Sequence, residues 1–471
     1  MTKEKNTHNR WLAFIVLCMG TLMIVLDTTI VNVALPSIKA DLAFTESTLA
    51  WVVNAYLLTF GGFLLLGGRL GDLFGQRRLF IVGITLFTLA SLACGFANTQ
   101  YFLIAARAIQ GIGGAICSAV GLSLVMNMFT KPDERARAMG YFGFIAAGGG
   151  SVGVLLGGFL TSLNWHLIFL VNIPIGVLVV ILSIILLPKG QNSTSRHLDV
   201  FGAVTITTSL MLAVYAIVNG NEVGWTSLQT IGFLGASILL MAAFLWIESR
   251  VKAPLMPLTL FKLRNVAVAN IVGVLWAAAM FAWFFISALY LQLVLGFTPL
   301  QVGLGFLPAN LIMAVFSFKL SAMLVMRFGI KKPLTVGLFL AAIGLLLFTR
   351  APVNGNFVTD VLPSMIFLGL GAGMAFNPML LAAMSDVKPT ESGLASGLVN
   401  TSFMMGGALG LAILASLAAS QSHQLMTSGS DQITALNGGY HAAFLVGAIF
   451  AALASLLGAT QLRISKTPPQ H

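Results

Sequence analysis

The feature that most constrains this chain is a succession of long apolar runs joined by short polar connections. Runs of about 20 apolar residues are long enough to cross the hydrocarbon core of a bilayer as α-helices. Hydrophobic residues make up 58% of the 471 positions and charged residues 8%, against roughly 25% charged residues in soluble domains. Such a chain has too little polar surface to fold in water, so we predict an all-α integral membrane protein.

We predict 14 transmembrane helices in this chain. The shortest separation between two of them is Leu163-Asn164-Trp165. The runs cover residues 11–35, 50–70, 79–98, 101–128, 138–162, 166–187, 200–219, 229–248, 267–293, 300–326, 333–349, 359–384, 394–420 and 440–462. The longest outer connection, residues 420–439, is rich in Ser, Gln and Thr, and we expect it to be a flexible loop.

The cations are distributed unevenly between the two faces that this topology predicts. Of the 25 Lys and Arg residues, two (Lys39 and Arg350) fall on one face, two (Arg107 and Lys319) lie within apolar runs, and the rest share the face of both termini. Cytoplasmic loops of membrane proteins carry such an excess of cations. We therefore predict cytoplasmic termini, and the formal charge of +11 needs no nucleic acid to explain it.

The order of the runs predicts two six-helix bundles and an inserted two-helix hairpin. We assign residues 1–190 to the N-terminal bundle, 191–252 to the hairpin and 253–471 to the C-terminal bundle. The connection Gly68–Arg78 has a counterpart in Met326–Lys332, with an Arg, a Gly and paired cations in both. Paired bundles of this kind surround a central site in transporters that rock between two conformations.

Asp27 lies in the middle of the first apolar run, where a carboxylate is costly unless it pairs, faces a cavity or binds a proton. It lies nine residues before Pro36, about 13 Å below the outer end of the first helix, and Arg107 lies about 10 Å below the same face. We predict that the two residues pair, that Asp27 takes up a proton and that Arg107 tunes this uptake. The alternatives are a static structural ion pair and an Asp27 that is bonded only to neighbours on its own helix.

Several strings together resemble the major facilitator superfamily, and most closely its 14-helix drug:proton antiporter branch. They are Leu26–Pro36 in the first helix, the connection Gly68–Arg78, Arg107–Gly114 in the fourth helix, the glycines of the fifth helix, and Leu289–Gln292 with Gly296–Pro299. The chain departs from the branch at Val154, where its signature has proline, at His166 and at Phe403. The missing proline weakens the inference of exchange over uniport.

The resemblance implies roles for three sets of residues. Asp27 and Arg107 are expected to couple transport to protons. A conformational latch between the bundles is expected at Asp72, Arg69, Gly75, Arg77 and Arg78. Gly149, Gly153, Gly157 and Gly158 match the antiporter glycines, and small residues at this spacing allow close helix packing. The substrate cavity is expected to include Asn32, Gln110, Trp283, Met374 and Asn377.

The leading hypothesis is a proton-coupled exporter of amphipathic small molecules in the bacterial cytoplasmic membrane. It needs a lipid bilayer and a proton gradient, and it needs no cofactor, metal or nucleic acid. Cys18, Cys94 and Cys117 lack metal-site spacing, and the chain has no Walker loop for ATP. No enzymatic activity is expected, and a monomer is compatible with the sequence. The alternatives are a transporter dedicated to one metabolite, in either direction, and a transport-inactive scaffold or sensor.

Two further expectations concern charge inside the membrane. Because Asp27 is the one acidic residue deep in a predicted helix, we expect monovalent cations, zwitterions or neutral drugs as substrates in preference to divalent cations. Lys319 is expected either to extend its side chain to the cytoplasmic interface or to be a second charge in the cavity.

Overall fold

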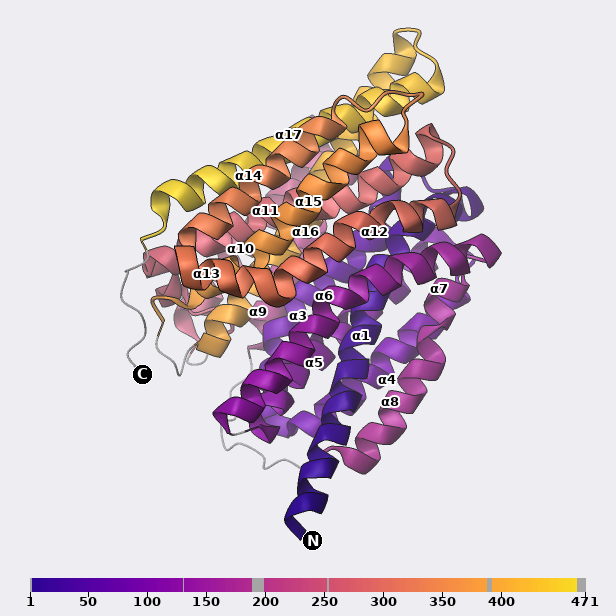
Figure 1. Cartoon of the computed structure of the whole chain (residues 1–471). Helices are drawn as coiled ribbons and strands as arrows, with labels where there is room; N and C mark the ends of the chain where they lie inside the picture. Colours follow the sequence, from indigo (N-terminus) through magenta and orange to yellow (C-terminus); the bar gives the residue numbers. More distant parts are fainter. Residues whose placement is uncertain (1, 130, 189–198, 252–253, 388–391, 464–471) are drawn as a thin grey trace. The chain divides into compact units, whose positions relative to one another are not determined.

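The computed structural model describes residues 2–129, 131–188, 199–251, 254–387 and 392–463, and its regular structure throughout these ranges is helical (Figure 1). Twelve helices of the described chain are long and apolar enough to cross a membrane. They coincide with twelve of the predicted spans. The other two predicted spans, 138–162 and 300–326, correspond to shorter apolar stretches, Gly149–Leu163 and Pro299–Val315. The all-helical membrane class is therefore confirmed, whereas the count of fourteen stays a prediction.

The chain forms two compact units. The first unit comprises Met1–Leu255 with Phe297–Leu304, and the second comprises Met256–Gly296 with Gly305–His471. The helices of the first unit are α1 (Thr2–Leu42), α2 (Glu46–Leu49), α3 (Trp51–Phe74), α4 (Gln76–Gly95), α5 (Gln100–Met128), α6 (Pro132–Leu163), α7 (Leu167–Leu170), α8 (Asn172–Leu186), α9 (Val200–Val223) and α10 (Leu228–Arg250).

Polar residues set several helix boundaries in the first unit. The Thr99 side chain accepts a hydrogen bond from Phe102 N and begins α5, and Ser227 begins α10 in the same way. The predicted break at Leu163-Asn164-Trp165 is confirmed, because α6 ends at Leu163 and α7 begins at Leu167. Helix α1 differs from the prediction, since it continues six residues beyond Pro36.

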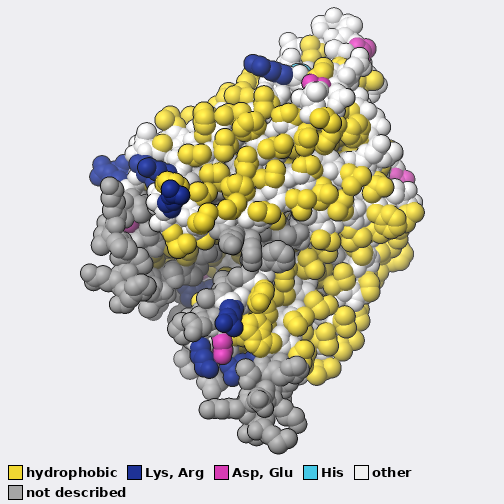
Figure 2. All heavy atoms as spheres, in the orientation of Figure 1, with side chains coloured by type: hydrophobic (Ala, Val, Ile, Leu, Met, Phe, Trp, Pro, Cys, Tyr) yellow, Lys and Arg dark blue, Asp and Glu magenta, His cyan; other side chains and the backbone are white. Residues whose placement is uncertain are grey.

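The helices α9 and α10 pack on each other as a hairpin, and α9 also packs on α3. A Cβ on Gly62 of α3 would lie 1.8 Å from the Thr207 hydroxyl oxygen of α9, so the missing side chain lets these two helices approach. Within the apolar 18-residue stretch of α10, only 17% is buried inside the protein. Hydrophobic side chains cover much of the described surface on the face seen in Figure 2, as expected for a protein whose solvent is lipid.

The second unit also consists of helices and helical turns. Its elements are η1 (Leu258–Lys262), α11 (Arg264–Leu289), η2 (Tyr290–Val294), α12 (Pro299–Val315, whose first residues belong to the first unit), η3 (Phe316–Leu320), α13 (Ser321–Phe328), α14 (Lys331–Phe348), η4 (Phe357–Val361), α15 (Leu362–Met384), α16 (Ser392–Thr427) and α17 (Gln432–Gln461). The expectation of a long flexible loop at residues 420–439 was wrong. Helix α16 continues to Thr427, and Asp431 accepts hydrogen bonds from Ile433 N and Thr434 N to begin α17.

Two glycines close equivalent turns in the two units. Gly75 joins α3 to α4 with φ of 93°, and Gly329 ends α13 just before α14 with φ of 75°. Residues with a side chain rarely adopt these angles, so glycine is required at both turns. The two turns lie in the connections Gly68–Arg78 and Met326–Lys332, which match each other in sequence.

Candidate functional site

Asp27 of α1 and Arg107 of α5 form an ion pair inside the first unit. Arg107 Nη1 lies 2.6 Å from Asp27 Oδ2, and each residue is 1% exposed. The two residues, which were predicted to lie at similar depths in the membrane, are therefore in direct contact. A charge pair removed from water must be well oriented and hydrogen-bonded to offset its desolvation, so the partners around the pair decide what it can do.

Three further buried side chains complete a network around the carboxylate. Gln110 of α5 donates through Nε2 to Asp27 Oδ1 at 2.7 Å, and Asn172 of α8 donates through Nδ2 to the same oxygen at 3.1 Å. The Ser91 hydroxyl of α4 accepts from both amides, at 3.2 Å from Gln110 and 3.0 Å from Asn172. Ser91 in turn donates to the carbonyl of Phe169 in α7. The carboxylate thus accepts three hydrogen bonds from two other helices.

The Arg107 guanidinium has partners that do not depend on Asp27. Its Nε donates to the Val52 carbonyl at 3.0 Å, and its Nη1 also donates to Gln110 Oε1 at 2.7 Å. The Tyr56 ring of α3 lies under the guanidinium, with its centroid 4.4 Å from Cζ. Carbonyl oxygens and an aromatic face both stabilise a cation. Arg107 can therefore stay in place when the charge on Asp27 changes.

The network surrounds a single acidic side chain, that of Asp27. Asp27 is its one carboxylate, and its ionised form is stabilised by three donors, one of them charged.

The predicted latch residues lie at the turn between α3 and α4. Gly75 forms the turn itself, and Arg77 donates through Nη2 to the carbonyl of Ile184 in α8. Arg69 is half-buried and Arg78 is exposed. The side chain of Asp72 lies outside the described residues, as does that of Lys319, so their predicted roles stay predictions.

The predicted antiporter glycines bring α6 into backbone contact with α1. A Cβ on Gly157 would lie 3.0 Å from Ile30 Cα, and one on Gly153 would lie 2.0 Å from the Thr29 hydroxyl oxygen. Gly149 faces Leu22 and Val25 one turn earlier. Gly158 points elsewhere, toward the backbone of Pro299 and Leu300 within the same unit. Helices α1 and α6 therefore approach each other closely along the stretch of α1 that carries Asp27.

The five residues predicted to line the substrate cavity lie in different surroundings. Asn32 donates to the Thr28 carbonyl of its own helix, and Gln110 is engaged in the network of Asp27. In the second unit, Trp283 is buried against Phe284 and Phe306, and Asn377 donates to the Ser317 carbonyl at 3.0 Å. Met374 is half-buried beside Gly337. A substrate cavity built from these residues stays a prediction.

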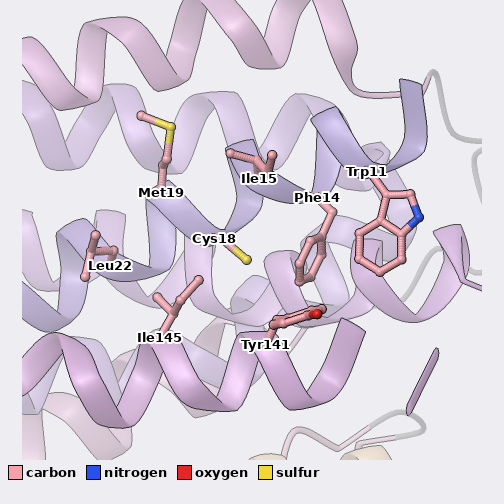
Figure 3. Close-up of a pocket in the computed structure, with 8 residues that line it drawn as sticks. All are labelled: Trp11, Phe14, Ile15, Cys18, Met19, Leu22, Tyr141 and Ile145. Carbon is pink, nitrogen blue, oxygen red and sulfur yellow. The ribbon is translucent and has the colours of Figure 1, made fainter. Parts of the chain in front are cut away.

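An apolar groove of about 360 Å³ lies between α1 and α6 in the first unit (Figure 3). This volume lies within the range of small-molecule pockets. None of the predicted cavity residues lines it. The lining residues are Trp11, Phe14, Ile15, Cys18, Met19, Leu22, Tyr141 and Ile145.

Two members of the network, Ser91 and Asn172, were not predicted from the sequence. Each is a polar residue inside an otherwise apolar run, and such residues in membrane helices often mark functional contacts. That signal alone would have drawn attention to them, but it could not say that both bond to the same partner. Among the described residues, no group of three or more His, Cys, Asp or Glu side chains could hold a metal ion.

Comparison with known proteins identifies the family. The model of the Major Facilitator Superfamily matches residues 17–411. The chain is 38% identical to the puromycin resistance protein pur8 of Streptomyces alboniger, over 86% of this chain and 81% of that protein. It is 35% identical to the cephamycin export protein CmcT of Amycolatopsis lactamdurans, over 99% and 96%, and 36% identical to the multidrug resistance protein Stp of Mycobacterium tuberculosis (strain CDC 1551 / Oshkosh), over 85% and 74%.

Solved structures show the same fold at low sequence identity. The partially occluded inward-open xylose transporter XylE from E. coli superposes with a TM-score of 0.65 at 16% identity, covering 98% of this chain and 100% of that one. The bacterial homolog of the human lysosomal transporter Spinster gives 0.65 at 15% identity, covering 98% and 99%. With the family model spanning most of its length, this chain belongs to the major facilitator superfamily.

Proposed function

We propose that this chain exports amphipathic small molecules, antibiotics among them, across the bacterial cytoplasmic membrane in exchange for protons. The observation that carries the proposal is the buried network around Asp27, which holds a single proton-binding group among charged and neutral donors. The names of the relatives supply the cargo, because they describe resistance or export proteins for puromycin, cephamycin and multiple drugs.

The proposed mechanism is alternating access by two six-helix bundles, with α9 and α10 as an inserted hairpin. Its energy source is the proton gradient, and it uses no cofactor. One copy of the chain, with both termini in the cytoplasm, is sufficient for this scheme. The bias of Lys and Arg toward the predicted cytoplasmic face supports the orientation.

We expect inverted membrane vesicles that contain the protein to accumulate ethidium when an acid-inside proton gradient is imposed. A protonophore should abolish the accumulation, because the gradient is the proposed energy source. Ethidium fluorescence in the vesicles measures both results. Accumulation that persists with protonophore would exclude proton exchange, and a vesicle preparation without the protein gives the background.

The charge of the substrate is expected to affect how well it is exported. We expect ethidium, a monovalent cation, to be exported well, and a bis-quaternary divalent dye to be exported poorly. Asp27 is the one acidic side chain predicted deep in the membrane, so one negative charge can offset one positive charge and a second positive charge would be costly to bury. Competition of the two dyes in the same vesicles measures the ratio, and equal transport would contradict this prediction.

A transporter dedicated to one metabolite remains the second candidate. The fold is shared with a sugar transporter, XylE, whose structure superposes over nearly the whole chain, and fold alone does not determine cargo. Proton-driven transport of a metabolite with no effect on ethidium would favour this candidate.

A further inference from the structure

We propose that Asn172 of α8 is the positioning residue that receives the hydrogen bond of protonated Asp27, by rotating its side-chain amide. This inference rests on the proposed proton exchange and adds a residue that acts through Asp27.

The proton belongs on Oδ1 of Asp27. The other oxygen, Oδ2, lies 2.6 Å from Arg107 Nη1, and a proton placed there would face a charged donor. At Oδ1 the proton that arrives from water forms a new O–H bond with an oxygen lone pair, and the carboxylate loses its negative charge. The same bond breaks when the proton is released on the other side.

A protonated Oδ1 would at first have donors as its nearest neighbours. Gln110 Nε2 and Asn172 Nδ2 both donate to it, at 2.7 Å and 3.1 Å. An O–H group must itself donate, and a buried donor without an acceptor is costly. One of the two amides must therefore present its oxygen to Asp27.

Gln110 cannot readily do so, because its oxygen is already in use. Gln110 Oε1 accepts a hydrogen bond from Arg107 Nη1 at 2.7 Å, and the Cys94 thiol donates to the same oxygen at 3.7 Å. Rotating this amide would turn its two donors toward the guanidinium, which repels them. Gln110 is thus held in one orientation by Arg107.

Asn172 has the opposite arrangement. Its side chain is 0% exposed, its Nδ2 bonds both Asp27 and Ser91, and its Oδ1 has no hydrogen-bond partner. A half-turn about the last side-chain torsion exchanges Nδ2 with Oδ1. The oxygen then accepts from Asp27 Oδ1–H, and the Ser91 hydroxyl turns its one hydrogen from the Phe169 carbonyl to the same oxygen.

The surroundings of Asp27 hold few other titratable groups that could substitute for this acceptor. Arg107 of α5, Cys94 of α4 and Tyr56 of α3 are the groups that interact with it. Helices α7 and α8 carry no charged residue. The charged residues of α6 all lie in its first six positions, whereas its close contact with α1 at Gly153 and Gly157 lies farther along the helix. Asn172 is therefore the group best placed to respond to the proton.

Infrared difference spectroscopy of the full chain in lipid vesicles, between alkaline and acidic pH, tests the proposal directly. A protonated Asp27 gives a carboxylic C=O stretching band, which Asp27→Asn should remove. We expect Asn172→Leu to shift this band to higher frequency, because the acid loses its acceptor. The matched control is Asn437→Leu, since Asn437 of α17 is also buried, donates to Ala351 O and has an unpartnered Oδ1.

Transport gives a second readout that a purely structural role would not produce. We expect Asn172→Leu to lower kcat for ethidium by about tenfold, the effect of one poorly satisfied buried group on the proton step, while KM stays unchanged. If the leucine variant does not fold, Asn172→Ala removes the amide without adding apolar bulk and should shift the band in the same direction.

The outcomes separate this proposal from the proposed function. A band that Asp27→Asn removes and that Asn172→Leu leaves in place overturns the role of Asn172 while proton binding at Asp27 stands. The absence of any band that depends on Asp27 overturns both. A shift in Asn172→Leu and none in Asn437→Leu supports the amide rotation.

Discussion

Replacing Arg107 with leucine is expected to leave little folded protein and no exchange. The change removes the cation that lies 2.6 Å from Asp27 in a fully buried site, and an orphaned buried charge costs about 3–5 kcal/mol of stability. The same change also removes the donor to Val52 O and the cation over the Tyr56 ring. Thermal unfolding of the purified protein in detergent, with ethidium transport in vesicles, measures both effects.

Asp27→Asn provides the matched comparison, and its expected phenotype is different. Asparagine resembles the protonated acid, and Arg107 keeps its bonds to Val52 and Gln110. We therefore expect this variant to fold and to lose proton-driven export. Adding Asp27→Asn to Arg107→Leu should recover much of the lost stability without restoring transport. Equal stability of the two single variants would contradict the asymmetry, and active export by Asp27→Asn would make Asp27 a structural residue.

The second large effect is expected from Gly157→Ala in α6. The added Cβ would lie 3.0 Å from Ile30 Cα and 3.1 Å from Ile30 O, and backbone atoms of a helix cannot move aside one at a time. Helices α1 and α6 must separate, at a cost of about 1–3 kcal/mol. Because the displaced stretch of α1 follows Asp27 directly, we expect ethidium export to fall by about tenfold.

Gly150→Ala is the matched control for this prediction. Its Cβ would approach nothing closer than Thr29 Cγ2, at 3.7 Å, which is ordinary van der Waals contact. The two variants make the same chemical change on the same helix, so propensity effects cancel. Unfolding temperature and export should remain close to those of the parent protein for Gly150→Ala. If both variants behave alike, the contact with Ile30 has no special role.

The membrane class and the pairing of Asp27 with Arg107 could be predicted from the sequence because each depends on position along a helix. Length and hydropathy define a span, and a rise of about 1.5 Å per residue gives the depth of a charge. The contribution of Asn172 and Ser91 could not be predicted in this way. Their hydrogen bonds depend on how α4 and α8 are rotated about their own axes, and this rotation is set by packing with neighbouring helices.

The errors in the prediction have local physical causes. Residues 420–439 contain many Ser, Gln and Thr residues, which suggested a loop, yet most of this stretch is helical in α16 and α17. The decisive signal was the single residue Asp431, whose side chain caps α17. At Pro36 the expected helix end did not occur, because membrane helices tolerate proline when neighbouring groups satisfy the freed carbonyl.

The independent partners of Arg107 have an electrical consequence. Since the guanidinium keeps its place and its charge, uptake of a proton by Asp27 changes the net charge of the buried network from zero to plus one. A membrane voltage acts on such a charge with about 2.3 kcal/mol per 100 mV for a full crossing. Under the proposed exchange, an inside-negative voltage therefore favours the proton-loaded network facing the cytoplasm, and export of a neutral drug draws on the voltage as well as on the pH difference.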